Sequence, residues 1–219
     1  EIISKNAQWF EDNSPVSPEF KKKEVKGVSA KVITVAQLGG DCHPVSPLGI
    51  NLPNADWIRK EHGSKSVTIA NIGDAYNKAA DEAPKSITGE FSWDDAEIKL
   101  MKDYGAYTNE IHTDLHECLG HGSGQLKEGV SSNALKEFSS PLEEARADIF
   151  ALYYMADSKM VELGILPNEE AYKAAYISYI RNGIFTQFVR IDLGKNVTQA
   201  HMQGRKLIAE WCYEKGKAE

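Results

Sequence analysis

The sequence is poor in cysteine, in basic residues and in long apolar stretches, and each shortage excludes a class of protein. Its 219 residues include three cysteines, an odd number without the spacing of a cysteine metal site, which favours reduced thiols. The net charge of −7 argues against a nucleic-acid-binding protein. No apolar run reaches the length of a membrane span, and no signal peptide opens the chain, so we expect no membrane contact and a cytoplasmic location.

The apolar residues that are present recur mostly with helical spacing, and no internal repeat divides the chain. We therefore expect residues 1–219 to form one mainly α-helical lobe with a few short strands. Asn168 and Asn196 are expected to cap the last two helices, and Asn182 with Gly183 predicts a bend or close packing in the middle of the first of them. The expected helices are 56–62, 74–83, 94–104, 107–121, 168–191 and one after residue 196, and the expected strand lies within 28–38.

Two histidines and a glutamate lie within six residues, at His116, Glu117 and His121. These are the elements of a hydrolytic zinc site, but the histidines are five residues apart instead of four. On a regular helix, this spacing separates them by about 140° around the axis. Binding one metal therefore requires a widened turn of π type, which Gly120 makes sterically easy. The alternative is a buried helix whose histidines bind backbone groups.

A second polar segment follows, in a helix whose start is predicted at Ser140. Glu143 stands three residues after this cap, as in a capping box. Glu144 and Asp148 continue an apolar stripe, and two carboxylates that face a core need compensating positive charge. Zinc with its histidines would supply that charge, with one carboxylate as third ligand and the others bound to imidazole N–H groups. Alternatively, Glu143 only caps the helix while Arg146 pairs with a neighbouring carboxylate.

Together, the segments 116–121 and 143–148 resemble the paired signatures of the dipeptidyl peptidase III family. Members of this family are zinc exopeptidases that remove dipeptides from the free amino end of short peptides. The resemblance extends from about Gly49 to Trp211. It implies one zinc ion per chain, with His116, His121 and Glu144 as ligands, Glu117 as general base, and Glu143 and Asp148 as carboxylates that hold the ligands.

The resemblance also implies contacts with the substrate. Asn51 and Asn54 would hold the amino end of the peptide, although beside Pro53 they are equally typical of turns. His201 would stabilise the developing oxyanion, and Arg205 would anchor the peptide beyond the cleaved bond. Because they are four residues apart, this pair shares one face of a helix, which without the resemblance is equally well a polar surface.

Members of the family are longer, two-lobed proteins, so we expect this chain to be the zincin-type lobe of such an enzyme. Its partners would then be short peptide substrates and a second lobe. The other function that we consider is a metal-stabilised interaction or scaffold lobe without turnover. Glu117 argues against it, because a structural zinc site needs no carboxylate beside its first ligand. His112 precedes His116 by four residues and is interpreted as a structural histidine, with a substrate-side role as the alternative.

Overall fold

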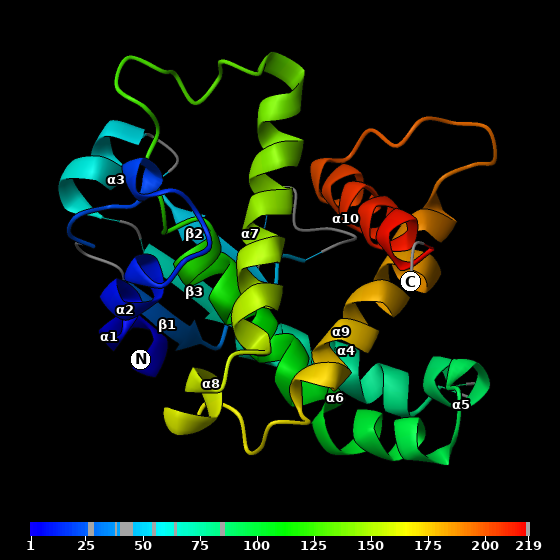
Figure 1. The fold of residues 1–219 in the computed structure, drawn as a ribbon. Helices are drawn as coiled ribbons and strands as arrows, with labels where there is room; N and C mark the ends of the chain where they lie inside the picture. Colours follow the sequence, from blue (N-terminus) through cyan, green and yellow to red (C-terminus); the bar gives the residue numbers. More distant parts are fainter. Residues whose placement is uncertain are drawn as a thin grey trace.

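The computed structural model describes residues 1–25, 29–37, 39, 46–53, 56–63, 65–83 and 86–217. Within these ranges the chain is mainly helical with a few short strands, which confirms the predicted fold class (Figure 1). No helix among the described residues has the length and apolar character that crossing a membrane requires. Asn54, which we expected to bind the amino end of a peptide, lies outside the described residues.

The strands of the described residues form one small sheet in the order β1-β3-β2. Its members are β1 (Ser29–Ile33), β2 (Gly49–Leu52) and β3 (Lys65–Ile69). β3 pairs parallel with β1 and antiparallel with β2, where Asn51 lies opposite Ser66. β2 is therefore an edge strand, and its residues from Gly49 onward lie beside the segment that follows α6.

The helices form around one long central element, α7, which in Figure 1 stands between the sheet and the last two helices. α10 packs on α7, and α6 packs on α9. The helical segments in the first half are α1 (Ile2–Lys5), α2 (Ala7–Asp12), η1 (Pro18–Phe20), α3 (Asp56–His62), α4 (Ala70–Asp81), α5 (Ile87–Phe91), α6 (Asp95–Leu115) and η2 (His116–Gly120). Those in the second half are η3 (Lys136–Phe138), α7 (Ser139–Met155), α8 (Lys159–Glu162), α9 (Tyr172–Arg181), η4 (Asn182–Gln187), η5 (Phe188–Arg190) and α10 (Ala200–Gly216).

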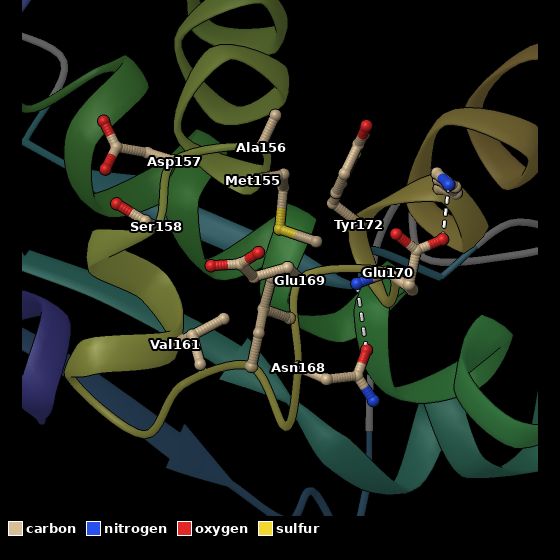
Figure 2. Close-up of a pocket in the computed structure, with 11 residues that line it drawn as sticks. Met155, Ala156, Asp157, Ser158, Val161, Asn168, Glu169, Glu170 and Tyr172 are labelled. Atoms are coloured by element: carbon tan, nitrogen blue, oxygen red, sulfur yellow. Dashed lines mark hydrogen bonds and ion pairs between the residues drawn. The ribbon is translucent and has the colours of Figure 1, made fainter.

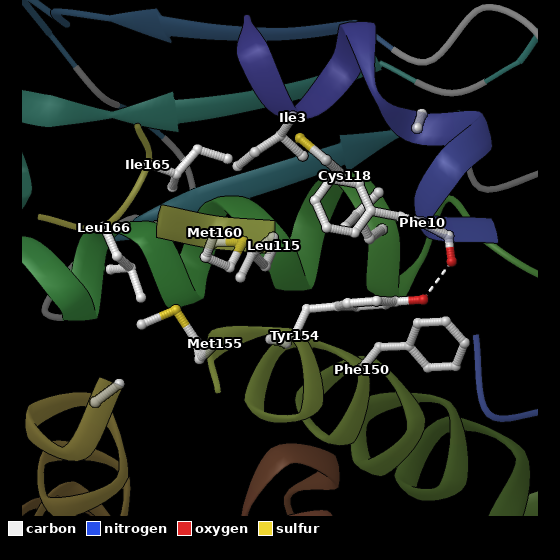
Figure 3. Close-up of a cluster of buried hydrophobic side chains, with 14 of the residues drawn as sticks. Ile3, Phe10, Leu115, Cys118, Phe150, Tyr154, Met155, Met160, Ile165 and Leu166 are labelled. Carbon is white, nitrogen blue, oxygen red and sulfur yellow. Dashed lines mark hydrogen bonds between the residues drawn. The ribbon is translucent and has the colours of Figure 1, made fainter. Parts of the chain in front are cut away.

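A buried apolar cluster holds the end of α6 against α7 and the N-terminal helices (Figure 3). Leu115 and Cys118 point into this cluster from α6 and η2. Tyr154 of α7 is fully buried, donates its hydroxyl to the Phe10 carbonyl, and meets the Phe10 ring edge-on at 4.8 Å. Burying an aromatic side chain of this size contributes roughly 1.5–3 kcal/mol, so the cluster fixes the segment between Leu115 and His121 firmly.

The structure corrects three of the predicted helix boundaries. The expected helices 94–104 and 107–121 are continuous, because Gly105 lies inside α6 and an isolated glycine costs a helix only about 1 kcal/mol. Ser140 is not an N-cap, since α7 begins at Ser139 without a side-chain cap. The last helix is capped by Gln199 instead of Asn196, and the Gln199 side chain accepts a bond of 2.8 Å from the Met202 amide.

Candidate metal centre

The turn that carries both histidines is widened, as their spacing predicted. The His121 amide donates to the His116 carbonyl, five residues back, at 3.0 Å. This bond defines η2 as a π-type turn, and it brings the two imidazole rings to 4.7 Å between centroids at an angle of 89°. Gly120 has a second role that the sequence did not reveal. A Cβ at this position would lie 2.7 Å from the Cα of Ala147, so the glycine allows α7 to approach η2.

Each imidazole is held by a carboxylate from α7. His116 Nδ1 lies 2.8 Å from Asp148 Oδ1, and His121 Nδ1 lies 3.0 Å from Glu143 Oε1. A carboxylate partner accepts a hydrogen bond from Nδ1–H, which leaves the lone pair of each Nε2 for another ligand. The Nε2 atoms of His116 and His121 are thus both oriented, and each can donate a lone pair.

Arg146 ties one of these carboxylates to the end of η2. Its Nε and one terminal nitrogen donate to Glu143 at 2.9 and 2.7 Å, and the same terminal nitrogen donates to the Gly120 carbonyl at 2.6 Å. Burial alone would raise the pKa of Glu143, but its bonds to His121 and Arg146 lower it to about 2. Glu143 is therefore ionised at neutral pH and serves the site instead of capping α7.

Three imidazole nitrogens converge on one oxygen of Glu144. Its Oε2 lies 3.3 Å from His116 Nε2, 3.6 Å from His121 Nε2 and 3.0 Å from His201 Nδ1. This oxygen is buried and has no well-formed hydrogen bond with any described residue. His116, Glu144 and His201 form the group whose donor atoms all lie within 4.8 Å of one another among the described residues.

The charges of this group suit a cation. Burial raises the pKa of Glu144, but the nearby imidazoles of His116 and His201 outweigh this effect, so the net pKa of Glu144 lies well below the ordinary value. Burial lowers the pKa of His116, whereas its bond to Asp148 and the nearby carboxylate of Glu144 raise it to about 10. The site thus attracts positive charge. Here that charge is a proton on His116, and a metal bound at His116 Nε2 would have to replace it. Imidazole nitrogen and carboxylate oxygen are donors that fit a divalent metal ion.

Glu117 lies beside this group, and the edge strand β2 approaches it closely. A Cβ on Gly49 would come within 2.9 Å of Glu117 Oε1, so the glycine leaves room for this carboxylate. Burial raises the pKa of Glu117, partly opposed by the nearby histidines His116 and His121. A buried carboxylate with a raised pKa is well suited to exchange protons with a substrate or water.

Asn51 is positioned by the sheet and by η2 together. Its Nδ2 donates to Ser66 Oγ at 2.8 Å and to the Glu117 carbonyl at 3.0 Å. Its Oδ1 is buried and has no partner among the described residues. Asn51 is therefore held beside Glu117 with an acceptor oxygen that no described residue uses.

Arg205, which we expected to contact the peptide, is largely buried against Tyr179. Its side chain is only 8% exposed, its guanidinium stacks 3.8 Å above the centroid of the Tyr179 ring, and it donates to the Tyr179 carbonyl. The structure also adds Tyr179 itself, whose hydroxyl donates to Asp148 Oδ2 at 2.8 Å. Nothing in the sequence singled out this tyrosine, because it lies 31 residues beyond Asp148 on another helix. His112 is largely buried, with Nε2 at 3.8 Å from Asp148 Oδ1.

A separate hollow of about 480 Å³ lies at the far end of α7 from Glu143 and Glu144 (Figure 2). It is lined by the turn after Met155 and by the segment that leads into α9, where Asn168 Oδ1 accepts a bond of 3.0 Å from the Glu170 amide. Its polar groups are mainly acidic side chains and their own local partners. None of the histidines described above lines this hollow.

The family model of peptidase family M49 matches residues 3–133 and 127–219 of this chain. Among curated proteins, Nudix hydrolase 3 of Arabidopsis thaliana is 28% identical over 98% of this chain and 27% of its own length. Dipeptidyl peptidase 3 of Nematostella vectensis is 26% identical over 95% of this chain and 30% of its own length. The chain thus spans less than a third of each of these two relatives.

Two solved structures also match nearly all of this chain and less than half of their own length. Dipeptidyl-peptidase III from Corallococcus sp. strain EGB superposes with a TM-score of 0.77 at 25% identity, over 98% of this chain and 38% of that one. DPP III from Caldithrix abyssi superposes with a TM-score of 0.70 at 27% identity, over 98% of this chain and 40% of that one. In both cases the likeness covers nearly all of this chain.

Proposed function

We propose that this chain, which belongs to peptidase family M49, takes part in the zinc-dependent hydrolysis of peptides and in the release of dipeptides from their amino ends. The observation that carries the proposal is the convergence of histidine nitrogens on the buried Oε2 of Glu144, with the Glu117 carboxylate beside them. A scaffold lobe without turnover would not need Glu117 at this place.

His116, His121 and Glu144 are the residues that we propose to hold the zinc ion. Asp148 and Glu143 fix the two imidazoles so that each Nε2 faces Glu144. When bound, zinc would polarise the carbonyl of the scissile bond and increase the acidity of a water molecule. The protein's part is to keep the ligands deprotonated and oriented, which requires the proton on His116 to be displaced.

Glu117 is proposed as the general base. Its carboxylate removes a proton from the attacking water and later delivers it to the leaving amine. Because burial raises the pKa of Glu117, the group accepts and returns a proton more readily at neutral pH than an exposed glutamate does. Gly49 supports this role by leaving space for the carboxylate next to the edge strand.

His201 and Asn51 are proposed to contact the peptide. The His201 side chain is 48% exposed and lies at the edge of the histidine group, where it can donate to an oxyanion that develops on the scissile carbonyl. The free acceptor Oδ1 of Asn51 suits the ammonium group at the amino end of a substrate. We propose that Asn54 acts with Asn51, as the family resemblance implies.

The division between ligand and base is tested with Glu117→Gln and Glu144→Ala. Glu117→Gln should keep zinc, measured as metal per protein, while kcat for a dipeptidyl arylamide falls roughly 10²–10⁴-fold. Glu144→Ala should lose most of the zinc. Glu137→Gln, in the exposed η3, is the matched control and should change neither quantity.

Two results would contradict this proposal. Equal loss of zinc in both variants would refute the separate roles of Glu117 and Glu144. Cleavage of a dipeptidyl arylamide with an acetylated amino end, at the rate of the free one, would refute the recognition of the amino end by Asn51. Such a result would leave a general peptidase in place of an exopeptidase that releases dipeptides from the amino end.

A further inference from the structure

Asp148 uses both of its oxygens in a continuous set of buried hydrogen bonds. Oδ1 accepts from His116 Nδ1, and Oδ2 accepts from the Tyr179 hydroxyl, each at 2.8 Å. Asp148 and Tyr179 are 4% and 5% exposed, so water does not compete for these bonds. Burial, with a smaller contribution from Asp148, raises the pKa of Tyr179, and its hydroxyl therefore remains a donor throughout the neutral range.

Arg205 stacks on the face of the Tyr179 ring. Its guanidinium lies 3.8 Å from the ring centroid and also donates to the carbonyl of the same residue. A cation on the face of a phenol ring attracts its π electrons, which makes the hydroxyl a stronger donor. Gly183 of η4 provides the space, because a Cβ there would lie 2.7 Å from Arg205 Cδ.

The orientation of His116 depends on the carboxylate that it contacts. With only one bond, the Asp148 carboxylate would be free to rotate about its terminal torsion, which is broad. The second bond, from Tyr179, fixes the plane of the carboxylate and therefore the direction from which Oδ1 accepts the hydrogen bond of His116. The same logic applies to His121, where Arg146 occupies the second oxygen of Glu143.

We propose that Tyr179, held in place by Arg205, is a positioning residue that orients His116 through Asp148. The proposal rests on the proposed function, because it takes His116 to be a metal ligand. Tyr179 has no direct bond to His116, and it acts only through the Asp148 carboxylate that lies between the two side chains. Arg205 accordingly serves the metal-binding side of the site instead of binding the peptide.

Tyr179→Phe tests the hydroxyl without removing the ring on which Arg205 stacks. We expect the dissociation constant for zinc, measured by competition with a chelator, to rise roughly threefold to tenfold, below the 10–100-fold of a direct partner of a ligand. The visible spectrum of the cobalt(II)-substituted protein should shift, because it reports the arrangement of the ligands. Tyr176→Phe is the matched control on the same helix, since its hydroxyl bonds to the Leu152 carbonyl at 2.9 Å. It should leave both measurements unchanged.

Asp148→Asn separates this inference from the proposed function. It should weaken zinc binding roughly 10–100-fold. If Asp148→Asn weakens zinc binding while Tyr179→Phe matches the unsubstituted protein in affinity and spectrum, the positioning role of Tyr179 is refuted. If Asp148→Asn also has no effect on zinc, His116 is not a ligand held by this carboxylate, and the proposed function fails with it. Thermal unfolding of the metal-free proteins establishes that each variant is folded.

Arg205→Met tests the second part of the inference and does not depend on the tyrosine variant. We expect weaker zinc binding with the KM for the dipeptidyl arylamide unchanged. An increased KM at unchanged zinc affinity would show that Arg205 binds the peptide and would overturn its assignment to Tyr179.

Discussion

Two widened turns in this protein, η2 and η4, are built alike and used differently. Each continues an α-helix, and each ends on an amide that bonds five residues back: His121 to His116 in η2, and Phe188 to Gly183 in η4. Each also contains a glycine that allows another helix to approach. At Gly120 the neighbour is the backbone of α7, whereas at Gly183 it is the side chain of Arg205.

This difference indicates how rigid each turn must be. η2 and the next residue, His121, carry two proposed ligands and the proposed base, and η2 packs against a backbone that cannot move away. None of the proposed ligand or catalytic residues comes from η4. This turn packs against the long side chain of Arg205, and that side chain can adjust. A widened turn with a glycine is thus a general way to bring two helices together, and only η2 also uses the change in phase to aim its side chains.

Removing the metal should give the largest difference in local stability between η2 and η4. At a zinc concentration a thousandfold above the dissociation constant, chelation should lower the free energy of unfolding by about 4 kcal/mol. Hydrogen exchange should then accelerate at the amides of η2 and the first turns of α7, and much less at η4. Equal acceleration in both turns would show that the metal stabilises the whole lobe without preference for η2.

Gly120→Ala should be the more damaging of the two glycine substitutions. The new methyl group would lie 2.7 Å from both Cα and Cβ of Ala147, and overpacking against a backbone costs typically 1–3 kcal/mol. We expect a loss of about 3 kcal/mol in chemical denaturation and a large loss of bound zinc. Gly105→Ala inside α6 is the control, because its Cβ meets only the mobile end of Met101 at 3.1 Å. A neutral Gly120→Ala would mean that η2 and α7 can separate freely.

The sequence predicted η2 better than η4 for a physical reason. The five-residue spacing of His116 and His121 specifies a change in helical phase, because both side chains must reach one metal. Asn182 and Gly183 indicate only that a helix is interrupted, without specifying which residue approaches. The partner Arg205 follows 22 residues later, and its arrival at Gly183 depends on how α10 packs against α7.

The same limit applies to the residues around the site. Glu144 and Asp148 were identifiable because they continue an apolar stripe, and Glu143 because it stands three residues after the expected cap and fits the family resemblance. The role expected for Ser140 was wrong because a local capping signature competes with tertiary bonds, and Glu143 bonds to His121 and Arg146 instead. Tyr179 was missed because an isolated tyrosine in a helix gives no sign of the carboxylate it will meet.

Gly183→Ala should have a smaller effect than Gly120→Ala. Its Cβ would lie 2.7 Å from Arg205 Cδ, but a side chain can change its rotamer where a backbone cannot. We expect a loss of about 1 kcal/mol in chemical denaturation, and a change in the environment of the Tyr179 ring. Gly73→Ala in α4 is the control, because nothing lies within 4 Å of its Cβ and alanine favours a helix. A loss as large as that of Gly120→Ala would remove the distinction between the two turns.

The smallest expected effect concerns His112, which lies in α6 one turn before η2 and contacts the Tyr179 ring of α9 at 5.5 Å between centroids. Its side chain is 13% exposed. Burial lowers the pKa of His112 to about 4, although Asp148 opposes this change. The folded protein therefore keeps His112 neutral in a range where the unfolded chain, with its ordinary pKa of 6.5, takes up a proton.

This shift reduces stability as the pH falls. The contribution of His112 is fully present above pH 6.5, and it declines until the pH reaches the folded pKa near 4. Between pH 7 and pH 6 the loss amounts to about 0.7 kcal/mol.

In the metal-free protein His116 acts in the opposite sense, because its pKa is raised to about 10. The quantity to measure is thus the difference in unfolding free energy between the unsubstituted protein and His112→Phe, in which the contribution of His116 cancels. That difference should fall by about 0.7 kcal/mol between pH 7 and pH 6. A difference that stays constant would show that folding does not shift the pKa of His112. A difference that rises between pH 7 and pH 6 would show that His112 is protonated in the folded state, as expected of a histidine paired with Asp148.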